Sequence, residues 1–440
     1  MHIVVKYYKI LDFYAYIILK YVMEEQMNNL EIVKYLSETD WSFADYNSSM
    51  FPFDINTLHW YPGTFVPIIP AVLIQLLSGE NDIVFDPFAG TGITAIESLR
   101  QNRVFYTNEI NPFANNIIQS KIASILTIDN AFLEAETKRL NTIKESGGIK
   151  NTFQHDQEKN EWFHVETLKG LSELYNYIIQ NQDSYSTVRK TVFSSILNFC
   201  SVQKEHYTYI TDNCRPNQNH FDKYEEVNKR KKRILREIPI DMFIKQLTQT
   251  CKAAIDFRNE FKNNYGPNFE TIIGRSITHE GDSKSLQWID DSSIDLIVTS
   301  PPYVGVNDYV RSMRLTHLFF PEVNKEYAES HEIGARYKRN RKNAFSSYIE
   351  DMKQVVSELN RIIKEDSFVC LIIGQSKGKF AIEDSVQIIM DELSSKYNFE
   401  LIYKEKRNFK FRRIGLKGIG HEWIIVMRSP ACKMIDINNE

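Results

Sequence analysis

Residues 82–111, DIVFDPFAGTGITAIESLRQNRVFYTNEIN, decide the fold. The apolar run at 82–87 predicts a buried strand, and the glycine-containing turn after it leads into a predicted helix at 93–101. A second strand is predicted at 104–111. Strand, turn, helix and strand in this order begin a doubly wound parallel sheet. The sequence therefore predicts an α/β fold that binds a ligand where its first strands end.

The rest of the chain extends this pattern on both sides. Residues 66–78 predict a helix opened by prolines. Strand-like runs that complete the sheet return near the carboxyl end, at 271–274, 294–300, 367–374 and 422–428, and helical patterns at 346–364 and 382–396 separate the last three. Residues 127–270 differ in character, being rich in Asn, Gln, Lys, Glu and Tyr, with helical patterns at 166–179 and 240–261. This stretch predicts a mostly helical insertion.

Composition sets broad limits. The chain has 440 residues, 42% of them hydrophobic, which is enough for a large core of two or three structural units. The formal net charge is −4, and it argues neither for nor against nucleic acid, because such proteins bind through local patches. The five cysteines form no C-x-x-C pair, so neither a disulfide framework nor a metal site is predicted, and a reducing cytoplasm is expected.

Residues 1–22 raise the question of a membrane segment. Lys6, Lys9, Asp12 and Lys20 interrupt the apolar run, which lacks the about 20 uninterrupted apolar residues of a bilayer span. We expect no membrane partner. A helix packed on the body of the protein and an upstream extension are both open interpretations.

The turn at 86–92, DPFAGTG, predicts a cofactor site. Gly90 and Gly92 let the backbone approach a ligand closely and aim amide N–H groups at it. Glu109 ends the next strand, 17 residues past Gly92, where an acid can accept hydrogen bonds from both ribose hydroxyls of a nucleoside cofactor. Alternatively, Glu109 is a solvated strand end and Asp86 a helix cap or turn acid. Asp282 could accept from an adenine amino group or serve as an N-cap.

TSPPY at 299–303 is the most informative motif. It follows the buried strand IDLIV, and two successive prolines cannot continue a sheet because neither has an N–H. They predict a rigid loop at the carboxyl end of the strand, where ligands bind in open α/β sheets. Without the upstream turn, the same motif could be a stiffened strand end with no chemistry.

These residues resemble the amino-methyltransferases of DNA, the N4-cytosine and N6-adenine family. DPFAGTG looks like the cofactor motif of that family and TSPPY like its catalytic motif. The segments at 59–77, 108–121, 280–303 and 307–320, with IGARYKR at 333–339, are similar to one subgroup. The resemblance implies a Rossmann-like S-adenosylmethionine-dependent methyltransferase fold with a seven-stranded sheet. It implies S-adenosylmethionine as cofactor, with contacts from Tyr61, Phe65, Asp86, Pro87, Phe88, Gly90, Gly92, Glu109 and Asp282.

The catalytic residues implied are Ser300, Pro301, Pro302 and Tyr303. The exocyclic amine of cytosine or adenine is a poor nucleophile, because its lone pair is delocalised into the ring. Ser300 Oγ and the Pro301 carbonyl could accept the amine hydrogens and favour a pyramidal nitrogen. Tyr303 would stack on the base, which must be flipped out of the duplex. Ser at position 300 is more usual in cytosine-N4 enzymes, so cytosine is favoured over adenine.

The expected organisation has four parts: a lead-in at 1–50, the cofactor half at 51–126, the insertion at 127–270 and the catalytic half at 271–440. The two motifs stand some 200 residues apart, and much of that gap is the insertion, a possible target-recognition region. One departure from the subgroup is Thr64, which replaces a basic residue and puts a contact to the cofactor carboxylate in doubt.

Double-stranded DNA is the predicted partner. Basic stretches at 229–236, 336–342 and 404–413 suit phosphate contacts, although each could be a solvated face. The candidate DNA-binding residues are Arg336, Lys338, Arg339, Arg341, Arg412 and Arg413. A site-specific enzyme of this type would work beside a companion restriction endonuclease or in phage defence.

Other functions are weighed against this one. RNA base methylation shares similar motifs, and a DNA-binding subunit that needs a partner would also carry them. The absence of a Pro-Cys nucleophile pair from the sequence argues against cytosine-C5 methylation. A nicotinamide oxidoreductase would explain the glycines and Glu109 but would leave TSPPY without a role.

Overall fold

A computed structural model describes residues 29–43, 54–64, 66–146, 152–203, 214–267, 269–320, 325–376, 384–407 and 419–431. Seven strands form one sheet in the order β3-β2-β1-β4-β5-β7-β6. The strands are β1 Ile83–Asp86, β2 Val104–Glu109, β3 Ile277–Glu280, β4 Ile294–Thr299, β5 Ile363–Ser376, β6 Glu400–Arg407 and β7 Ile419–Arg428. The seven-stranded sheet predicted for a Rossmann-like methyltransferase fold is confirmed.

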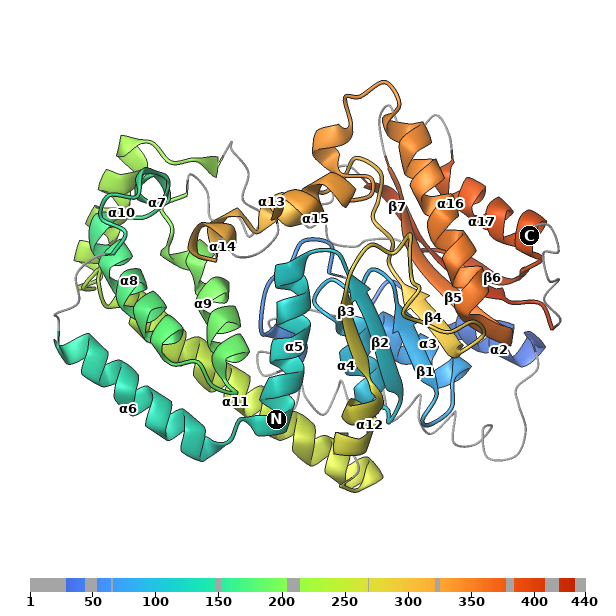
Figure 1. Ribbon diagram of the computed structural model, residues 1–440, viewed down its shortest axis with the longest axis horizontal. Coiled ribbons are helices and arrows are strands. Elements are labelled where there is room, and N and C mark those ends of the chain that lie inside the picture. The colour runs from blue at the N-terminus through green and yellow to red at the C-terminus, as the bar shows by residue number, and fades with distance from the viewer. Residues whose placement is uncertain are drawn as a thin grey trace.

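The order of the strands places the two motif loops together. β1 is parallel to both β2 and β4, and β4 is parallel to β5. The chain runs outward from β1 through β2 to β3, then returns to lay β4 against the other side of β1 (Figure 1). β7 is antiparallel to β5 and β6. DPFAGTG follows β1 and TSPPY follows β4, so both loops leave the sheet at the point where the strand order reverses.

Helices cover both faces of the sheet, as its alternating burial requires. Leu296 and Val298 of β4 pack in one cluster with α3 (Ile68–Leu77) and α2 (Asn29–Glu38). Ile297, between them, points into the opposite cluster with α16 (Ala344–Ile362) and α17 (Ser385–Asp391). α4 (Ile93–Arg100) packs on β1 and β2. The observed architecture is therefore doubly wound.

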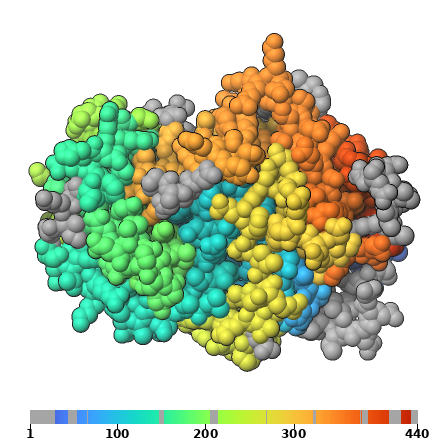
Figure 2. Space-filling model, in the orientation of Figure 1, coloured from blue at the N-terminus to red at the C-terminus, as the bar shows by residue number. Residues whose placement is uncertain are grey.

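The described residues between β2 and β3 form helices. These are α5 Pro112–Thr127, α6 Asn130–Ser146, α7 Gln157–Trp162, α8 Val165–Gln180, α9 Ser186–Cys200, α10 Gln218–Arg230, α11 Ile238–Tyr265 and α12 Phe269–Arg275. α11, the longest, packs against α5, α6, α8 and α9. Figure 1 and Figure 2 show most of them as a green lobe beside the sheet.

This helical lobe shares a core with the segment after the TSPPY loop, which contains α13 (Tyr309–Ser312), α14 (Arg314–Phe319) and α15 (Lys325–His331). The Phe319 ring lies 5.1 Å from that of Phe193 in α9. Ser194 Oγ is 2.6 Å from Thr316 Oγ1 and 2.9 Å from His59 Nε2. Burial lowers the pKa of His59 to about 4, so its ring stays neutral at physiological pH. The lobe is thus joined to the catalytic side of the sheet.

One predicted strand is wrong. Residues 271–274 lie in helix α12, and the edge strand is β3, at 277–280. Short apolar runs do not distinguish a strand from one helical turn. Phe269 and Ile272, three residues apart, face the same buried cluster. β6 was not predicted, because its sequence ELIYKEKR is too polar to stand out.

The described residues contain no helix that combines the length and apolar character needed to cross a membrane. The apolar run at 1–22 lies outside the described residues.

Candidate active site

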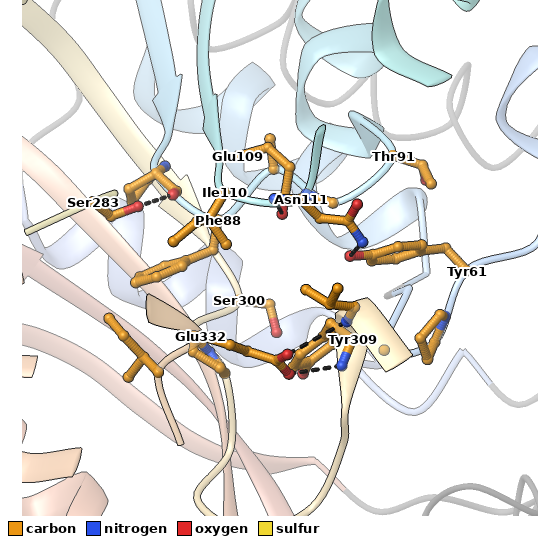
Figure 3. A pocket seen from close by; sticks show the side chains of 18 of the residues that line it. Tyr61, Phe88, Thr91, Glu109, Ile110, Asn111, Ser283, Ser300, Tyr309 and Glu332 are labelled. Carbon is orange, nitrogen blue, oxygen red and sulfur yellow. Dashed lines mark hydrogen bonds between the residues drawn. The ribbon is translucent and has the colours of Figure 1, made fainter. Parts of the chain in front are cut away.

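A cavity opens at the carboxyl ends of β1, β2 and β4, and both motif loops line it (Figure 3). With its open mouth it holds about 790 Å³, a size typical of small-molecule sites. Predicted residues in its wall are Tyr61, Pro87, Phe88, Gly90, Glu109, Asp282, Ser300 and Pro302. Residues far apart in the sequence therefore meet in one place.

The turn after β1 depends on its glycines. Gly90 and Gly92 have φ values of +52° and +76°, in the left-handed region that favours glycine. Gly92 is the N-cap of α4, and a Cβ on it would stand 3.0 Å from Ile118. A Cβ on Gly90 would point at the Tyr61 ring, 3.4 Å away, inside the cavity wall. This close backbone surface is what a cofactor needs at a helix N-terminus.

Glu109 holds this turn against the end of β2. Its carboxylate accepts hydrogen bonds from Gly90 N at 2.7 Å and Asn111 N at 2.9 Å. Burial raises the pKa of Glu109 to about 7, against the lowering effect of these two N–H donors. Each oxygen has a second lone pair, so the carboxylate keeps the capacity to accept ligand hydroxyls.

Asp86 faces inward rather than into the cavity. Its fully buried carboxylate accepts from Thr299 Oγ1 at 2.6 Å, Thr94 Oγ1 at 2.7 Å and Phe88 N at 3.0 Å. Burial raises its pKa to about 6. These contacts bind the cofactor turn to the TSPPY strand, so Asp86 positions both loops in this structure.

The loop after β3 completes the cofactor side of the cavity. Asp282 lines the cavity and accepts from Lys284 N at 3.0 Å within a turn, and because no helix begins there the N-cap alternative is wrong. Asn108 Nδ2 donates to Ser283 Oγ at 3.0 Å, and the Ser283 hydroxyl donates to the Pro87 carbonyl. These bonds tie the ends of β1, β2 and β3 together.

The TSPPY loop presents Ser300 and Pro302 to the cavity. Pro301 is buried. The Pro302 carbonyl accepts from Tyr348 Oη at 3.1 Å, which anchors the loop to α16. Figure 3 shows the Ser300 side chain directed into the space between Phe88 and Glu332.

Tyr303 lies elsewhere than the stacking role requires. Its ring is buried in the sheet core, 8% exposed, and its hydroxyl donates to Glu422 at 2.6 Å. Arg407 pairs with the other oxygen of Glu422, also at 2.6 Å. A phenol hydroxyl that donates to a buried carboxylate forms a charge-assisted hydrogen bond, and this bond holds the Tyr303 ring inward. Tyr61 and Tyr309 line the cavity instead, with ring centroids 6.2 Å apart.

Tyr309 and Glu332 are among the wall residues that the sequence analysis did not single out. They face the cavity from the segment after the TSPPY loop. Both adjoin or lie within stretches already matched to the family, at 307–320 and 333–339. That proximity was the available signal, but nothing in the pattern shows which side chains turn inward.

The basic candidates fall into three groups. Arg339 and Arg341 are exposed, and Arg336 is half-buried. Lys338 is turned inward, and its ammonium donates to the carbonyls of Ser330 and Glu332 at 3.0 and 2.7 Å. Arg412 and Arg413 lie outside the described residues, and so does Phe65, a predicted cofactor contact. Within the stretch at 404–413, Arg407 is buried in its pair with Glu422, and so cannot contact phosphate.

A protein-family model described as DNA methylase, of the N6 and N4 methyltransferase type, matches residues 18–120 and 294–433. The two matched segments contain the DPFAGTG and TSPPY loops that meet at the cavity. The chain belongs to this DNA methylase family. Between the two matched segments the family model leaves out residues 121–293, which hold most of the helical lobe and also β3.

Two relatives share most of the length of this methylase. The Type II methyltransferase M.MvaI of Kocuria varians is 22% identical over 406 residues, covering 82% of this chain and 85% of the relative. The Type II methyltransferase M.MjaII of Methanocaldococcus jannaschii is 21% identical over 393 residues, covering 74% and 73%. Among solved structures, the rRNA methyltransferase aviRa of Streptomyces viridochromogenes aligns over 84% of this chain and 88% of its own, with 10% identity and a TM-score of 0.33.

S-adenosylmethionine is the methyl donor of this methylase family, and the cavity fits it. Thr91 lines the cavity, and its buried hydroxyl has no hydrogen-bond partner among the described residues. Buried polar atoms are normally paired, so this hydroxyl points to a missing ligand. The spare lone pairs of the Glu109 carboxylate suit the ribose hydroxyls, and Gly90, which has no side chain, lets the backbone approach the cofactor.

Proposed function

We propose that this methylase methylates N4 of cytosine within a specific sequence of double-stranded DNA. The observation that carries the proposal is the position of Ser300, on the wall of the same cavity as Glu109 and Asp282. A serine there, in place of the Asp or Asn more usual in adenine-N6 enzymes, favours cytosine. Adenine N6 is the second candidate.

Bound S-adenosylmethionine supplies an electrophilic methyl group, and the chain positions the acceptor. Ser300 Oγ and the Pro301 carbonyl accept the hydrogens of the exocyclic amine, so that its lone pair is directed at the methyl carbon. Two prolines keep this loop rigid, and Tyr348 anchors it through the Pro302 carbonyl. Direct attack needs no covalent intermediate with the protein.

The residues that line the cavity indicate which contacts the cofactor would make. The Glu109 carboxylate accepts hydrogen bonds from the ribose hydroxyls, and the Asp282 carboxylate accepts one from the adenine amino group. Tyr61 and Phe65 adjoin the methionine end, while Pro87, Phe88, Gly90 and Gly92 form the turn that approaches the nucleoside. Asp86 supports this turn from behind through Thr94 and Thr299.

DNA would lie across the mouth of the cavity. Arg339 and Arg341 are exposed near the TSPPY loop, and the Arg311 guanidinium lies 3.9 Å from the centre of the Tyr337 ring. Arg336 lies beside them, and Arg412 and Arg413 are further candidates for phosphate contacts. We assign sequence recognition to the helical lobe, where the exposed basic residues 229–233 lie at the end of α10 and just after it. We also propose that the enzyme pairs with a restriction endonuclease in a prokaryotic cytoplasm; the relatives M.MvaI and M.MjaII are Type II methyltransferases.

The proposal is tested by expressing the chain in a host that lacks DNA methylation and mapping modified bases across its genome. N4-methylcytosine at one recurrent sequence is the expected result. N6-methyladenine would move the proposal to the second candidate, and unmodified DNA from cells with folded, cofactor-binding protein would overturn it. The same host without the protein is the control for background modification.

Recognition by the lobe is tested separately. Because α9 shares its core with Phe319, deleting 127–270 would unfold the catalytic side. Reversing the charges of Lys229, Arg230 and Lys231 leaves that core intact. We expect weaker DNA binding at unchanged cofactor affinity, and unchanged DNA affinity would place recognition near 305–345.

A further inference from the structure

Glu332 is a carboxyl group in the cavity wall that the chemistry above does not use. It lies just after α15, is 3% exposed, and lines the cavity with Ser300 and Tyr309. Figure 3 shows Glu332 and Ser300 on the same side of the cavity, across from Glu109. A buried acid beside the catalytic loop needs a reason, because unpaired buried carboxylates are costly.

The two oxygens of Glu332 are held unequally. Oε1 accepts from Tyr309 N at 2.7 Å, a normal hydrogen bond, whereas Oε2 accepts from Val310 N at a long 3.4 Å. The Glu332 carbonyl is itself fixed by Lys338 Nζ at 2.7 Å. The carboxyl group is therefore held in place through Oε1, and Oε2 retains hydrogen-bonding capacity.

The surroundings of Glu332 favour its neutral form. Burial is the main cause and raises the pKa of Glu332 to about 8, with Asp308 adding to the rise and Lys338 opposing it. Other titratable side chains near Glu332 are the phenols of Tyr61 and Tyr337, whose pKa values burial raises, and His331, which lines the same cavity. At neutral pH the carboxyl therefore carries a proton, and Oε2 can donate it in a hydrogen bond.

We propose that Glu332 reads the ring nitrogen beside the amino group of the flipped base, donating a hydrogen bond from Oε2 to N3 of cytosine or N1 of adenine. This inference rests on the proposed function. Both amino bases present an unprotonated acceptor nitrogen there. Thymine N3 and guanine N1 carry hydrogen, so with either base two hydrogen-bond donors, the ring N–H and Glu332 Oε2, would face each other. Glu332 thus selects the amino bases, while Ser300 and Pro301 take the amine itself.

The pH profile distinguishes this role from simple capping of α13. Wild-type single-turnover rates should fall as pH rises through about 8, since the proton that Oε2 donates is then lost. Glu332→Gln keeps one acceptor and one donor without titrating, so its rate should stay within a few-fold of wild type and remain flat over that range. If Glu332 only capped α13, ionisation would strengthen the cap, and neither protein would lose activity at high pH.

A modified base gives a second measurement. DNA carrying 3-deazacytosine (1-deazaadenine, if adenine is the mapped base) at the target lacks the acceptor nitrogen. Wild type should discriminate against this DNA by about tenfold more than Glu332→Ala does. In wild type the modified base leaves the Glu332 donor without an acceptor, whereas the variant has no donor at this position. Cofactor affinity of each variant, measured by calorimetry, confirms that it is folded.

The outcomes separate the two proposals. Equal discrimination by wild type and Glu332→Ala, or a Glu332→Gln profile that falls with pH like wild type, would overturn the role of Glu332 and leave the methylation reaction standing. If Glu332→Ala fails to fold, the Glu332→Gln profile alone decides. Absence of any methylated amino base with the wild-type protein would instead overturn the proposed function.

Discussion

The Thr299 hydroxyl donates to the Asp86 carboxylate at 2.6 Å, joining two residues that are 213 positions apart. Asp86 opens the cofactor turn and Thr299 opens the TSPPY loop, so this one buried hydrogen bond connects the two motifs. It spans β1 and β4, the neighbours at which the strand order reverses. The geometry that brings cofactor and base together therefore depends on a contact inside the sheet.

Thr299→Val should destabilise the fold. It leaves a fully buried carboxylate with one donor fewer, at a cost of about 1–3 kcal/mol. Urea unfolding measures the change. Thr107→Val is the matched control, since the buried Thr107 hydroxyl on β2 has no hydrogen-bond partner among the described residues. Equal loss of stability in both variants would show that the Asp86 contact contributes nothing.

Gly90→Val should abolish cofactor binding. The new side chain would strain a left-handed backbone and meet the Tyr61 ring in the cavity wall. Calorimetry should show at least about a tenfold loss of affinity, equivalent to about 1.4 kcal/mol. Gly266→Val introduces the same kind of strain at φ +77° with nothing within 4 Å, and should leave affinity unchanged. Wild-type affinity in Gly90→Val would remove Gly90 from the site.

Ser300→Ala should slow methyl transfer without weakening cofactor binding. The Pro301 carbonyl would remain as the second acceptor for the amine. Loss of one preorganised transition-state hydrogen bond commonly costs about 100–1000-fold in rate. Single-turnover transfer from labelled cofactor measures it. A wild-type rate would mean that Ser300 is a structural residue of the loop.

Tyr303→Phe should lower stability while retaining much of the activity, because it removes the hydroxyl that Glu422 accepts but keeps the ring. The expected loss is about 1–3 kcal/mol, as for other buried hydrogen bonds to charge. Tyr348→Phe, which removes a bond to a neutral carbonyl, should lose less.

Tyr303→Ala separates two roles for the ring. If the ring swings out to stack on the base, its removal should weaken DNA capture by about 1–3 kcal/mol. If the ring stays in the core, stability falls and the affinity of the folded fraction for DNA does not. Fluorescence binding to DNA that carries the target base, compared between Tyr303→Ala and Tyr303→Phe, distinguishes the two. DNA with an abasic target is the control, because it offers no base to stack on.

Cofactor affinity should strengthen as pH rises through about 7, the pKa to which burial raises Glu109. An ionised carboxylate accepts two hydroxyl hydrogen bonds, and a neutral carboxyl does so less well. Lys121, which donates to the Thr91 carbonyl, also has its pKa lowered to about 7 and would titrate in the same range. Glu109→Gln isolates the contribution of Glu109. A profile identical to wild type would assign the pH dependence to Lys121 or another group.

Residue patterns within a few positions of one another were enough to predict much of this protein. Local sterics and hydrogen-bonding capacity determine the strand–turn–helix at 82–101, the positive-φ glycines and the proline-stiffened loop after IDLIV. The residue types themselves fix both properties. The same local logic failed at 271–274, where four apolar residues suit either a strand or a helical turn.

Tertiary structure alone decided where the side chains of those motifs point. Tyr303 is turned into the core because Glu422, more than a hundred residues later, lies behind it, and Asp86 is turned inward by Thr299. Glu332 enters the cavity because α15 packs against α13 and the Glu332 carboxylate accepts from the first N–H groups of α13. Each outcome depends on burial and pairing between segments distant in the chain. Local sequence carries the chemistry of a side chain, whereas packing determines which neighbour satisfies it.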